Sequence, residues 1–491
     1  MRVLLVPPTH HYKSPEPLSL SDFPSGFAYL AASLKGYEVI GFSPNNIKGY
    51  PSSKIMLQAE LSKKIQETQP DLIGFGGLCT DYAFLKDAIA ITRSATKSPI
   101  ALGGQIVTND AQFIYQDLKP DYAIIGEADE VITALADELP EPGILRASII
   151  KDLNNLPFPD YEAFGVRDML DNYSMSTRLL YRYSRPYPRP FNIVASRSCP
   201  FQCTFCIHGH RDIPYRSRSV ENIMEEIRIM YERYEFNILI ILDELFAVKK
   251  DRMTAFCNAV LEGKEKYKWD FDWMFQTHAS ARFDIESLKL AKQAGCFFFS
   301  YGLESASPKV LQSMKKRIAV EDVVKAMEMA QEAKIGFGAN LIFGDPAETA
   351  ETWAESLSFW LQHCQRNFVF LSTLMPYPGS ALFDSRFKDK KYYYEHIDET
   401  AINMTSIPDK TLTGLLNLTT YLEKSWLFVK EAKARVELES GKMFKLYAIC
   451  PYCGEESLYR QEIQDISKPY MFGVGCTHCH SRIKVELNGM V

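Results

Sequence analysis

The sequence predicts an α/β protein with an N-terminal Rossmann-like open parallel sheet, a central partial (β/α)6 barrel of the TIM type and a small C-terminal ribbon. Three observations predict this fold class. Short apolar, β-branched runs alternate with amphipathic segments over residues 1–140 and again over residues 191–384, and two cysteine pairs lie near the C-terminus. Such alternation indicates parallel strands joined by helices. A chain of 491 residues has room for two to four domains.

The first domain, residues 1–140, contains five runs with the composition of strands: RVLLV, YEVIGF, DLIGFGG, PIALGG and DYAIIG. Residues 25–35, 54–68 and 82–96 have helical spacing, and Ile55, Leu57, Leu61 and Ile65 are expected to share one helix face. Open α/β sheets bind ligands at the carboxyl ends of their strands. Those ends read GGLCTD, GGQIVT and GEADE, whose glycines would let the backbone approach a large flat or phosphate-bearing ligand, although ordinary tight turns explain them equally well.

Residues 141–190 are rich in proline and tyrosine and are predicted to be a linker. The barrel, residues 191–384, has six candidate strands: FNIVAS, NILIIL, FDWMF, FFFSYG, FGANLIF and NFVFLST. Six βα units are too few to close an eight-unit barrel, so an open one is expected. Residues 385–443 are predicted to be a helical extension, with SWLFVKEAKARVELES as its clearest helix, and residues 444–491 a terminal metal-binding domain.

The composition, 46% hydrophobic and 24% charged, is typical of a soluble globular protein. The formal net charge of −6 gives no global electrostatic reason to expect nucleic acid as a partner. The longest apolar run is interrupted at Asp243 and Glu244, so no membrane span is expected and we predict a cytoplasmic protein. Cysteines in that compartment are more often metal ligands than disulfide partners. Four scattered cysteines are expected to be small buried hydrophobic residues: Cys79, Cys257, Cys296 and Cys364.

The terminal domain contains two C-x-x-C pairs, formed by Cys450, Cys453, Cys476 and Cys479. Their spacing predicts a tetrahedral structural zinc site, a zinc ribbon, with rubredoxin-like iron as the alternative metal. His478 or His480 could replace one cysteine as a ligand. A site closed by four protein ligands has no position for chemistry, so the ribbon would either cap the barrel or help to recognise a peptide or carrier-bound substrate.

A second cysteine group, CPFQCTFC, places Cys199, Cys203 and Cys206 directly after the first barrel strand. A zinc site there would need a fourth ligand, which His208 or His210 could supply. Iron–sulfur clusters are also held by cysteine thiolates. Three thiolates on one loop would leave one iron of a 4Fe–4S cluster open to bind a substrate.

This segment resembles the signature of the radical S-adenosylmethionine (radical SAM) family. The resemblance implies that the three cysteines bind a 4Fe–4S cluster, that its open iron chelates SAM, and that reduction of the cluster yields a 5′-deoxyadenosyl radical. It also implies SAM contacts at successive strand ends: Phe205 against the adenine, Asp243 and Glu244 in LDELF at the amino group, and Glu304 and Ser305 in YGLES at the ribose.

The fifth strand, within GANLIFGDPAET, resembles the family pattern G-x-I-x-G-x-x-E. By that resemblance Gly338, Gly344 and Glu348 shape the adenine site, and Asn340 is expected to face the cofactor. The segment LMPYPGSALFD, residues 374–384, resembles the closing segment of family members that carry an N-terminal cobalamin domain.

The turns of the first domain look like those of that cobalamin domain. The resemblance implies contacts to the corrin and its nucleotide tail from Gly76, Thr80, Gly103, Gly104, Gly126 and Glu127. The motif D-x-H-x-x-G, which supplies a cobalt-ligating histidine, is absent from the sequence; His10 and His11 follow the first strand but are more simply solvated loop residues. Methylthiotransferases of the same superfamily bind a second cluster through three cysteines of the N-terminal domain. This domain has only Cys79, so the chain is not expected to be a methylthiotransferase.

The resemblance therefore implies a cobalamin-dependent radical SAM enzyme. Its expected reaction is methyl transfer from SAM, via methylcobalamin, to an unactivated carbon or phosphorus centre of a small-molecule or carrier-bound substrate, with flavodoxin or ferredoxin as electron donor. Ring contraction or cyclisation is the alternative reaction. A hypothesis of another class is a non-catalytic zinc-binding interaction protein in which both cysteine groups hold zinc.

Overall fold

The computed structural model describes residues 1–9, 12, 23–44, 54–173, 184–207, 213–281, 283–384, 387, 389–397 and 402–487. The chain divides into two compact units. The first unit contains Met1–Ser176, Phe205–Ser217 and Pro376–Ala401, and the second contains Thr177–Thr204, Arg218–Met375 and Ile402–Val491. Each unit has its own sheet system.

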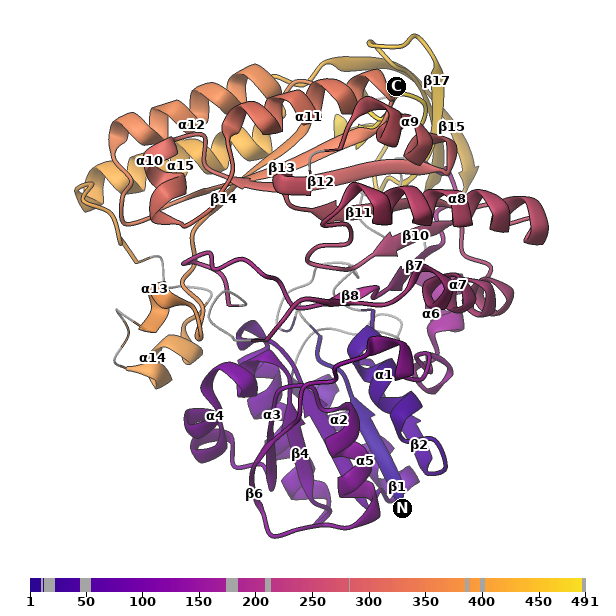
Figure 1. Ribbon diagram of the computed structural model, residues 1–491, viewed down its shortest axis with the longest axis vertical. Helices are drawn as coiled ribbons and strands as arrows, with labels where there is room; N and C mark the ends of the chain where they lie inside the picture. The colour runs from indigo at the N-terminus through magenta and orange to yellow at the C-terminus, as the bar shows by residue number, and fades with distance from the viewer. Residues whose placement is uncertain are drawn as a thin grey trace. The chain divides into compact units, whose positions relative to one another are not determined.

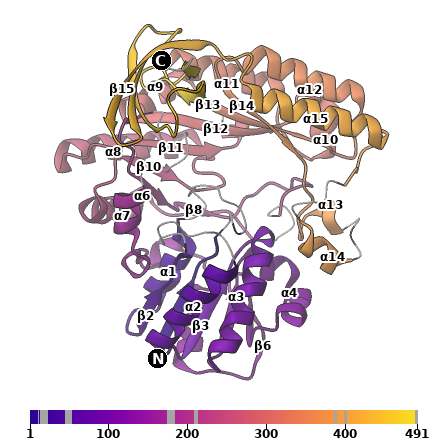
Figure 2. The same ribbon diagram turned by 180° about the vertical axis from the view of Figure 1, so that it is seen from behind.

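The first unit contains a six-stranded parallel sheet in the order β2-β1-β3-β4-β5-β6. Helices α1 and α5 pack together, and α2, α3 and α4 form a second packed group, as in an open sheet with helices on both faces (Figure 1, Figure 2). The strand order reverses between β1 and β3, which is where open α/β sheets bind ligands. The strands are β1 (Arg2–Val6), β2 (Glu38–Gly41), β3 (Leu72–Gly76), β4 (Ile100–Gly103), β5 (Tyr122–Ile125) and β6 (Gly143–Arg146), and the helices are α1 (Ser25–Ser33), α2 (Lys54–Thr68), α3 (Tyr82–Ala95), α4 (Gln105–Leu118) and α5 (Asp129–Asp137).

Two details of this unit differ from the sequence prediction. Strand β6 lies inside the predicted linker, where it pairs with β5 as an edge strand. In α2, Leu57, Leu61 and Ile65 are buried, but the side chain of Ile55 is 80% exposed, so its predicted place on the buried face is wrong. The reason is angular: residues two positions apart in a helix point about 200° apart, whereas i and i+4 share a face.

A late segment of the chain packs into the core of the first unit. It contains α13 (Ala381–Asp384) and α14 (Lys390–Glu395). Phe383, Tyr393 and Tyr394 share a buried cluster with Tyr82 and other residues of α3 and α4. Sequence reasoning divided this segment between the barrel and the helical extension, because no local pattern shows which distant surface an aromatic group will cover.

The second unit is built on a parallel six-stranded sheet in the order β14-β13-β12-β11-β10-β7, called the barrel sheet below (Figure 1). Each strand pairs with its predecessor, and the first and last strands do not pair, so the sheet is the predicted open partial barrel. The α/β fold class is thus confirmed. The strands are β7 (Pro190–Ile193), β10 (Ile238–Ile241), β11 (Asp272–Thr277), β12 (Cys296–Glu304), β13 (Gly336–Phe343) and β14 (Phe368–Thr373), and the helices are α7 (Val220–Tyr234), α8 (Lys250–Tyr267), α9 (Ile285–Gln293), α10 (Pro308–Ser313), α11 (Val320–Glu332) and α12 (Ala350–His363).

Several of these helices begin at a polar N-cap that the sequence supplies. The side chains of Ser219, Asp284 and Thr349 accept hydrogen bonds from backbone N–H groups in the first turns of α7, α9 and α12. Caps of this kind satisfy donors that a helix leaves open and set where it starts.

The C-terminal part of the second unit contains helix α15 (Asp409–Ser425) and a five-stranded sheet in the order β17-β16-β15-β19-β18. Its strands are β15 (Glu431–Ser440), β16 (Met443–Ile449), β17 (Glu456–Glu462), β18 (Tyr470–Gly475) and β19 (Arg482–Leu487). The predicted helix over SWLFVKEAKARVELES is wrong: α15 ends before Trp426, and β15 follows. Lysine, glutamate and alanine favour helix only weakly, and pairing of β15 with both β16 and β19 overrides that preference.

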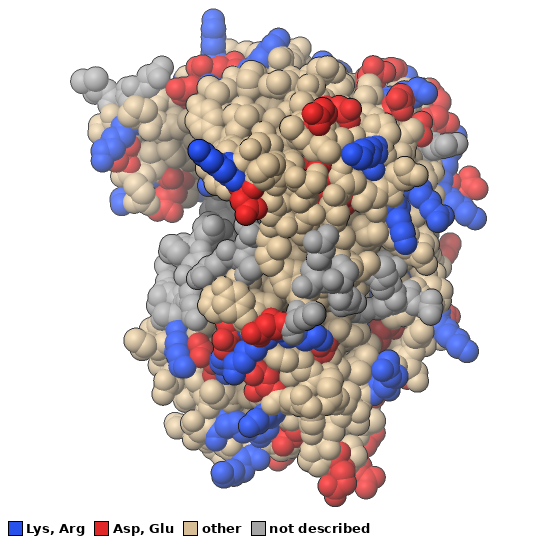
Figure 3. All heavy atoms as spheres, turned by 90° about the vertical axis from the view of Figure 1, so that its left-hand side faces the viewer, with Lys and Arg blue, Asp and Glu red and all other residues tan. Residues whose placement is uncertain are grey.

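On the face drawn in Figure 3, lysine and arginine side chains lie among aspartate and glutamate side chains. In the described part of the chain, every helix is too short or too polar to cross a membrane.

Candidate functional site

The carboxyl end of β7 leads into the loop that carries Cys199, Cys203 and Cys206, called the cluster loop below. Asp243, which follows β10, holds its start: one carboxylate oxygen accepts from the backbone N–H of Ala195 at 2.7 Å and the other from Ser196 Oγ at 2.7 Å. Burial raises the pKa of Asp243 to about 6. These bonds favour a positioning role for Asp243 over the predicted contact with SAM. Glu244, the next residue, is half-buried, and a carboxylate is the type of group that binds an ammonium.

A buried ion pair braces the same strand end. Arg218 pairs with Glu226 of α7, and its Nη1 also donates to the carbonyl of Val194 at 2.9 Å. Arg252 donates to the carbonyl of Arg218 at 2.8 Å. Sequence reasoning missed Arg218 and Arg252, because nothing in their local pattern distinguishes them from surface arginines.

The thiols of the cluster loop suit a metal cluster. The three cysteines form no disulfide; Cys203 is buried, and Cys199 and Cys206 are half-buried. Burial raises the pKa of Cys199 and Cys203, and the nearby Lys316 lowers both. Cys206 follows Cys203 by three residues, at most about 11 Å of chain. Three such thiols fit a 4Fe–4S cluster with one open iron. His208 and His210, the ligands that a zinc site would need, lie outside the described residues.

The sequence YGLES lies at the carboxyl end of β12, whose last residue is Glu304. Lys316, whose charge acts on Cys199 and Cys203, contacts this strand end. Glu304 has a left-handed backbone (φ 69°), is buried, and pairs with Lys316 Nζ at 3.0 Å. A Cβ at Gly302 would lie 2.4 Å from Glu304 Oε1 and 2.6 Å from Lys316 Nζ, so a larger residue there would displace this ion pair. Ser305 is also buried, with its Oγ 3.1 Å from Ser356 Oγ. Ser305 therefore positions the start of α10 rather than lining an open surface.

Strand β13 and the loop after it contain the G-x-I-x-G-x-x-E residues. A Cβ at Gly338 would lie 2.6 Å from the Phe298 ring, so the glycine keeps β12 and β13 close. Gly344 has φ 114°, and its N–H donates to Glu348 Oε2 at 2.6 Å. Burial raises the pKa of Glu348 to about 7. Asn340 is exposed in mid-strand, as expected of a residue on the concave face of an open barrel.

The strand register extends this concave face to residues that sequence reasoning missed. Side chains two positions apart in a strand share a face. Gln276 is level with Ser300, Gly302 with Asn340, and Ile342 with Ser372. Gln276 and Ser372 are exposed, and Ser300 is half-buried. These polar side chains therefore lie on the same face of the sheet as Asn340. The alternation of side chains along each strand could have predicted this from the sequence.

In the first unit, the candidate cobalamin residues lie at the carboxyl ends of β3, β4 and β5. Gly104 has φ 87°, and a Cβ there would lie 2.6 Å from the backbone of Gly77, so the two turns touch through glycine. Thr108 Oγ1 donates to the carbonyl of Gly104 and accepts from the N–H of Gly126, tying the turns after β4 and β5 together. Gly77 and Thr108 are additions to the predicted set.

This edge of small residues fits a large flat ligand. Gly76 and Gly103 end adjacent paired strands, and Thr80 is exposed on the turn after β3. Glu127 plays a different part, because it forms a two-pronged ion pair with Arg216, at 3.0 and 2.5 Å, and accepts from the backbone N–H of Ile150 at 3.1 Å. Its position favours fixing chain segments onto the sheet rather than binding the corrin. His10 and His11 lie outside the described residues.

The terminal cysteines lie close enough together to hold one zinc ion. The thiol sulfurs of Cys450, Cys453, Cys476 and Cys479 all lie within 4.8 Å of one another. The pairs Cys450–Cys479 and Cys453–Cys476 are each 3.7 Å apart. A tetrahedron with Zn–S bonds of ~2.3 Å has S–S edges of about 3.8 Å. The four thiols therefore fit one zinc ion.

The two histidines that were alternative ligands have other partners. His478 Nε2 lies 3.0 Å from the carbonyl of Glu456, and His480 Nε2 lies 2.8 Å from Lys292 Nζ. Among the described residues, the donor set that could hold the ion is therefore the four cysteines.

The ribbon contacts the amino-terminal edge of the barrel sheet. Arg482 is buried and stacks on Trp426, and its backbone N–H donates to the carbonyl of Arg366, just before β14. Tyr452 donates to the carbonyl of Gln365 at 2.7 Å. The cluster loop leaves the opposite, carboxyl edge of the same sheet. These contacts favour the role of a stabilising cap over that of a substrate-recognition module.

Comparison with known proteins identifies a domain in each part of the chain. Residues 23–136 match the B12 binding domain, and residues 193–359 match the Radical SAM superfamily. "Uncharacterized methyltransferase PH0819" of Pyrococcus horikoshii is 24% identical over 78% of this chain and 83% of its own length. The anaerobic magnesium-protoporphyrin IX monomethyl ester cyclase of Cereibacter sphaeroides is also 24% identical, over 78% of this chain and 63% of its own length.

A solved structure shares the fold. The radical S-adenosylmethionine methyltransferase TsrM from Kitasatospora setae, with cobalamin and a [4Fe-4S] cluster bound, superposes with a TM-score of 0.58 at 17% identity, over 78% of this chain and 74% of that one. An open sheet of the B12-binding type, followed by a cysteine loop at the carboxyl edge of a partial barrel, defines a radical SAM enzyme with a corrin domain. The chain belongs to the cobalamin-dependent radical SAM enzymes. The predicted family and its cofactors, a 4Fe–4S cluster, SAM and cobalamin, are thereby confirmed.

Proposed function

We propose that this enzyme transfers a methyl group from SAM, by way of cobalamin, to an unactivated carbon of a small-molecule substrate. The observation that carries the proposal is the presence in one chain of a B12-type domain and of three partly buried cysteines, none in a disulfide, on the loop after the first barrel strand. The methyltransferase names of PH0819 and TsrM support methyl transfer as the use of this pair.

The residues in and around the cluster loop have two different roles, cluster binding and positioning of the loop. Cys199, Cys203 and Cys206 would hold the cluster, and Asp243 and Arg218 fix the strand end before them. When bound, the cluster and SAM supply a 5′-deoxyadenosyl radical and cobalamin supplies the methyl group. Burial of the strand ends keeps water and stray hydrogen donors away from such a radical.

The pair of Glu304 and Lys316 gives this edge fixed charges of both signs. Glu244 is the candidate acceptor for the SAM ammonium group, and the concave-face residues Gln276, Ser300 and Asn340 are candidates for polar contacts to SAM or substrate. Gly302 and Gly338 provide room that larger residues would fill.

In the first unit, Gly76, Gly103, Gly104 and Gly126 would let the backbone approach the corrin, and Thr108 keeps their turns in register. We further propose that a small electron-transfer protein, flavodoxin or ferredoxin, reduces the cluster in the cytoplasm. A freely diffusing substrate is favoured over a carrier-bound one, because the ribbon that could recruit a carrier already packs on the barrel.

Anaerobic reconstitution of the full chain with iron, sulfide and cobalamin tests the proposal. With dithionite and methyl-labelled SAM, we expect 5′-deoxyadenosine and recovery of labelled methyl on the cobalamin fraction. Cys203→Ala should abolish both products, whereas the matched control Cys257→Ala, a cysteine of α8, should retain them. Deoxyadenosine formation by Cys203→Ala would contradict the cluster assignment, and failure of the label to reach cobalamin would contradict methyl transfer.

A second function has support from the similarity to the magnesium-protoporphyrin IX monomethyl ester cyclase. A cyclase or ring-rearrangement enzyme of this type would use the same radical without passing the methyl group to the product. Production of deoxyadenosine with an unlabelled cobalamin fraction would favour it.

A further inference from the structure

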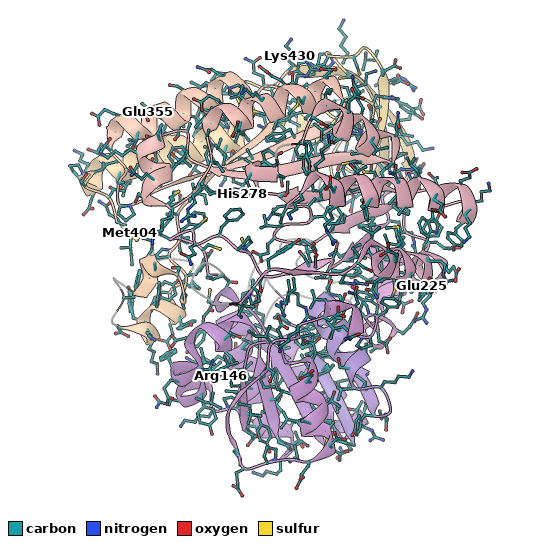
Figure 4. The ribbon with its side chains drawn as sticks, in the orientation of Figure 1. Arg146, Glu225, His278, Glu355, Met404 and Lys430 are labelled. Atoms are coloured by element: carbon teal, nitrogen blue, oxygen red, sulfur yellow. The ribbon has the colours of Figure 1, made fainter. Side chains whose placement is uncertain are left out.

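His278 is the first residue after β11, the third strand of the barrel sheet, and therefore lies at its carboxyl edge (Figure 4). Its side chain is only 5% exposed. The family resemblance assigned no role to this position, and it lies outside the motifs that the sequence analysis singled out.

The hydrogen bonds of the imidazole fix its tautomer. Nδ1 accepts from the backbone N–H of Ser280 at 3.2 Å and lies 2.9 Å from Ser280 Oγ. A nitrogen that accepts from a backbone N–H carries no proton, so a neutral ring must carry its proton on Nε2. Burial and the positive charge of Lys316 lower the pKa of His278 to about 4, which keeps the ring neutral near pH 7.

The donor on Nε2 has no hydrogen-bond partner among the described residues. A buried N–H without an acceptor is costly, and a native structure that keeps one usually reserves it for a ligand or water. The position of the His278 ring beside the cluster loop indicates which ligand its Nε2–H could bind. It stacks on Phe201, with centroids 3.8 Å apart and planes 20° apart, and Phe201 lies between Cys199 and Cys203 in the cluster loop.

Lys316 also lies near both His278 and the cluster loop. Its charge acts on His278 and on the thiols of Cys199 and Cys203. The donor therefore lies next to the cluster loop, near the ion pair of Lys316 and Glu304, and an N–H donor there suits an oxygen acceptor of the ligand that the cluster would bind.

We propose that His278 is a SAM-binding residue whose Nε2–H donates a hydrogen bond to an oxygen of SAM, with its ring held in place by Phe201 and Ser280. This inference rests on the proposed function for the presence of SAM and adds a contact from the third strand of the barrel. The ring enters no proton-transfer step; it binds and orients.

Two substitutions separate binding from structure. His278→Phe keeps an aromatic ring to stack on Phe201 but has no donor, and His278→Gln keeps an N–H donor at a similar reach. In the reconstituted holoenzyme, equilibrium dialysis with labelled SAM should give a dissociation constant about tenfold higher for the Phe variant and within about threefold of wild type for the Gln variant. The electron paramagnetic resonance signal of the reduced cluster should shift on SAM addition in the wild type and Gln enzymes, with a reduced response in the Phe enzyme.

The melting temperature without SAM is the structural control. Both variants lose the bonds that Nδ1 makes with Ser280, so both should melt at a similar, slightly lower temperature, and only the affinity for SAM should separate them. Wild-type affinity in the Phe variant, or equal loss of affinity in both variants, would overturn the proposal. If the wild-type enzyme binds SAM yet leaves the label off cobalamin, methyl transfer is refuted while the role of His278 stands.

Discussion

Replacing Arg218 with methionine is the sharpest test of how the barrel holds its cluster loop. The Arg218 side chain is 4% exposed, its partner Glu226 in α7 is fully buried, and the guanidinium also binds the carbonyl of Val194 at 2.9 Å. Methionine keeps the apolar stem and removes the charge. Glu226 would then be a buried carboxylate without its cation.

The expected cost is large. Removing one partner of a buried ion pair costs about 3–5 kcal/mol. For a domain the size of the second unit, 1 kcal/mol corresponds to about 2–4 °C. The melting temperature of Arg218→Met should therefore fall by about 10 °C, and iron incorporation should fall with it, because the strand end before the cluster loop loses its brace.

The pH dependence has a definite sign. Burial raises the pKa of Glu226 and Arg218 counteracts that rise, so removing Arg218 raises the pKa further. A carboxyl whose folded-state pKa lies above its unfolded value contributes stability at low pH that is lost as the pH rises through the folded pKa. The deficit of Arg218→Met should therefore be small at pH 4.5 and grow towards pH 8.

Urea and thermal unfolding at the two pH values measure this deficit. The double variant Arg218→Met/Glu226→Leu is the control, since it removes both charges and should recover most of the lost stability. An Arg218→Met protein within about 1 kcal/mol of wild type, well below the cost of an unpaired buried charge, would refute the reasoning. A deficit equal at both pH values would do the same.

Three further predictions concern the other sites. Gly104→Ala, which would put a Cβ 2.6 Å from the backbone of Gly77, should weaken cobalamin binding at least tenfold by equilibrium dialysis, while Gly26→Ala, which meets nothing within 4 Å, should not. The Glu348 pKa of about 7, raised from 4.5, predicts that Glu348→Gln gains up to about 3 kcal/mol relative to wild type between pH 5 and pH 8 in urea unfolding; an unchanged pH dependence would contradict the burial argument. Cys453→Ser should lose the ribbon zinc and melt at lower temperature while elemental analysis still finds about four irons per chain; retained zinc would disprove the four-cysteine centre.

The sequence alone determined the elements and their order. Short apolar, β-branched runs found every strand of the two parallel sheets except β6, and period-3.6 spacing found most of their helices, because those patterns are local. The cysteine spacings also predicted the zinc site, because two C-x-x-C pairs can place four thiols round one ion whatever the rest of the fold is.

Local pattern failed where a distant partner decides. The segment over β15 has a helix-favouring composition, yet pairing with β16 and β19 makes it a strand. The error at Ile55 has a local cause instead: it stands two positions from Leu57 and therefore points away from the buried face. Tyr393 and Tyr394 pack against α3, which lies far earlier in the chain.

The same division runs through the functional sites. Sequence placed carboxylates at the strand ends, but only the tertiary structure showed that Asp243 holds the backbone of Ala195 and that Glu127 holds Arg216. It also isolated the Nε2–H of His278 beside Phe201. A residue's type fixes what it can donate or accept, and that much is written in the chain. Whether the group forms its hydrogen bonds within the protein or with a ligand depends on neighbours that only folding brings within hydrogen-bond distance.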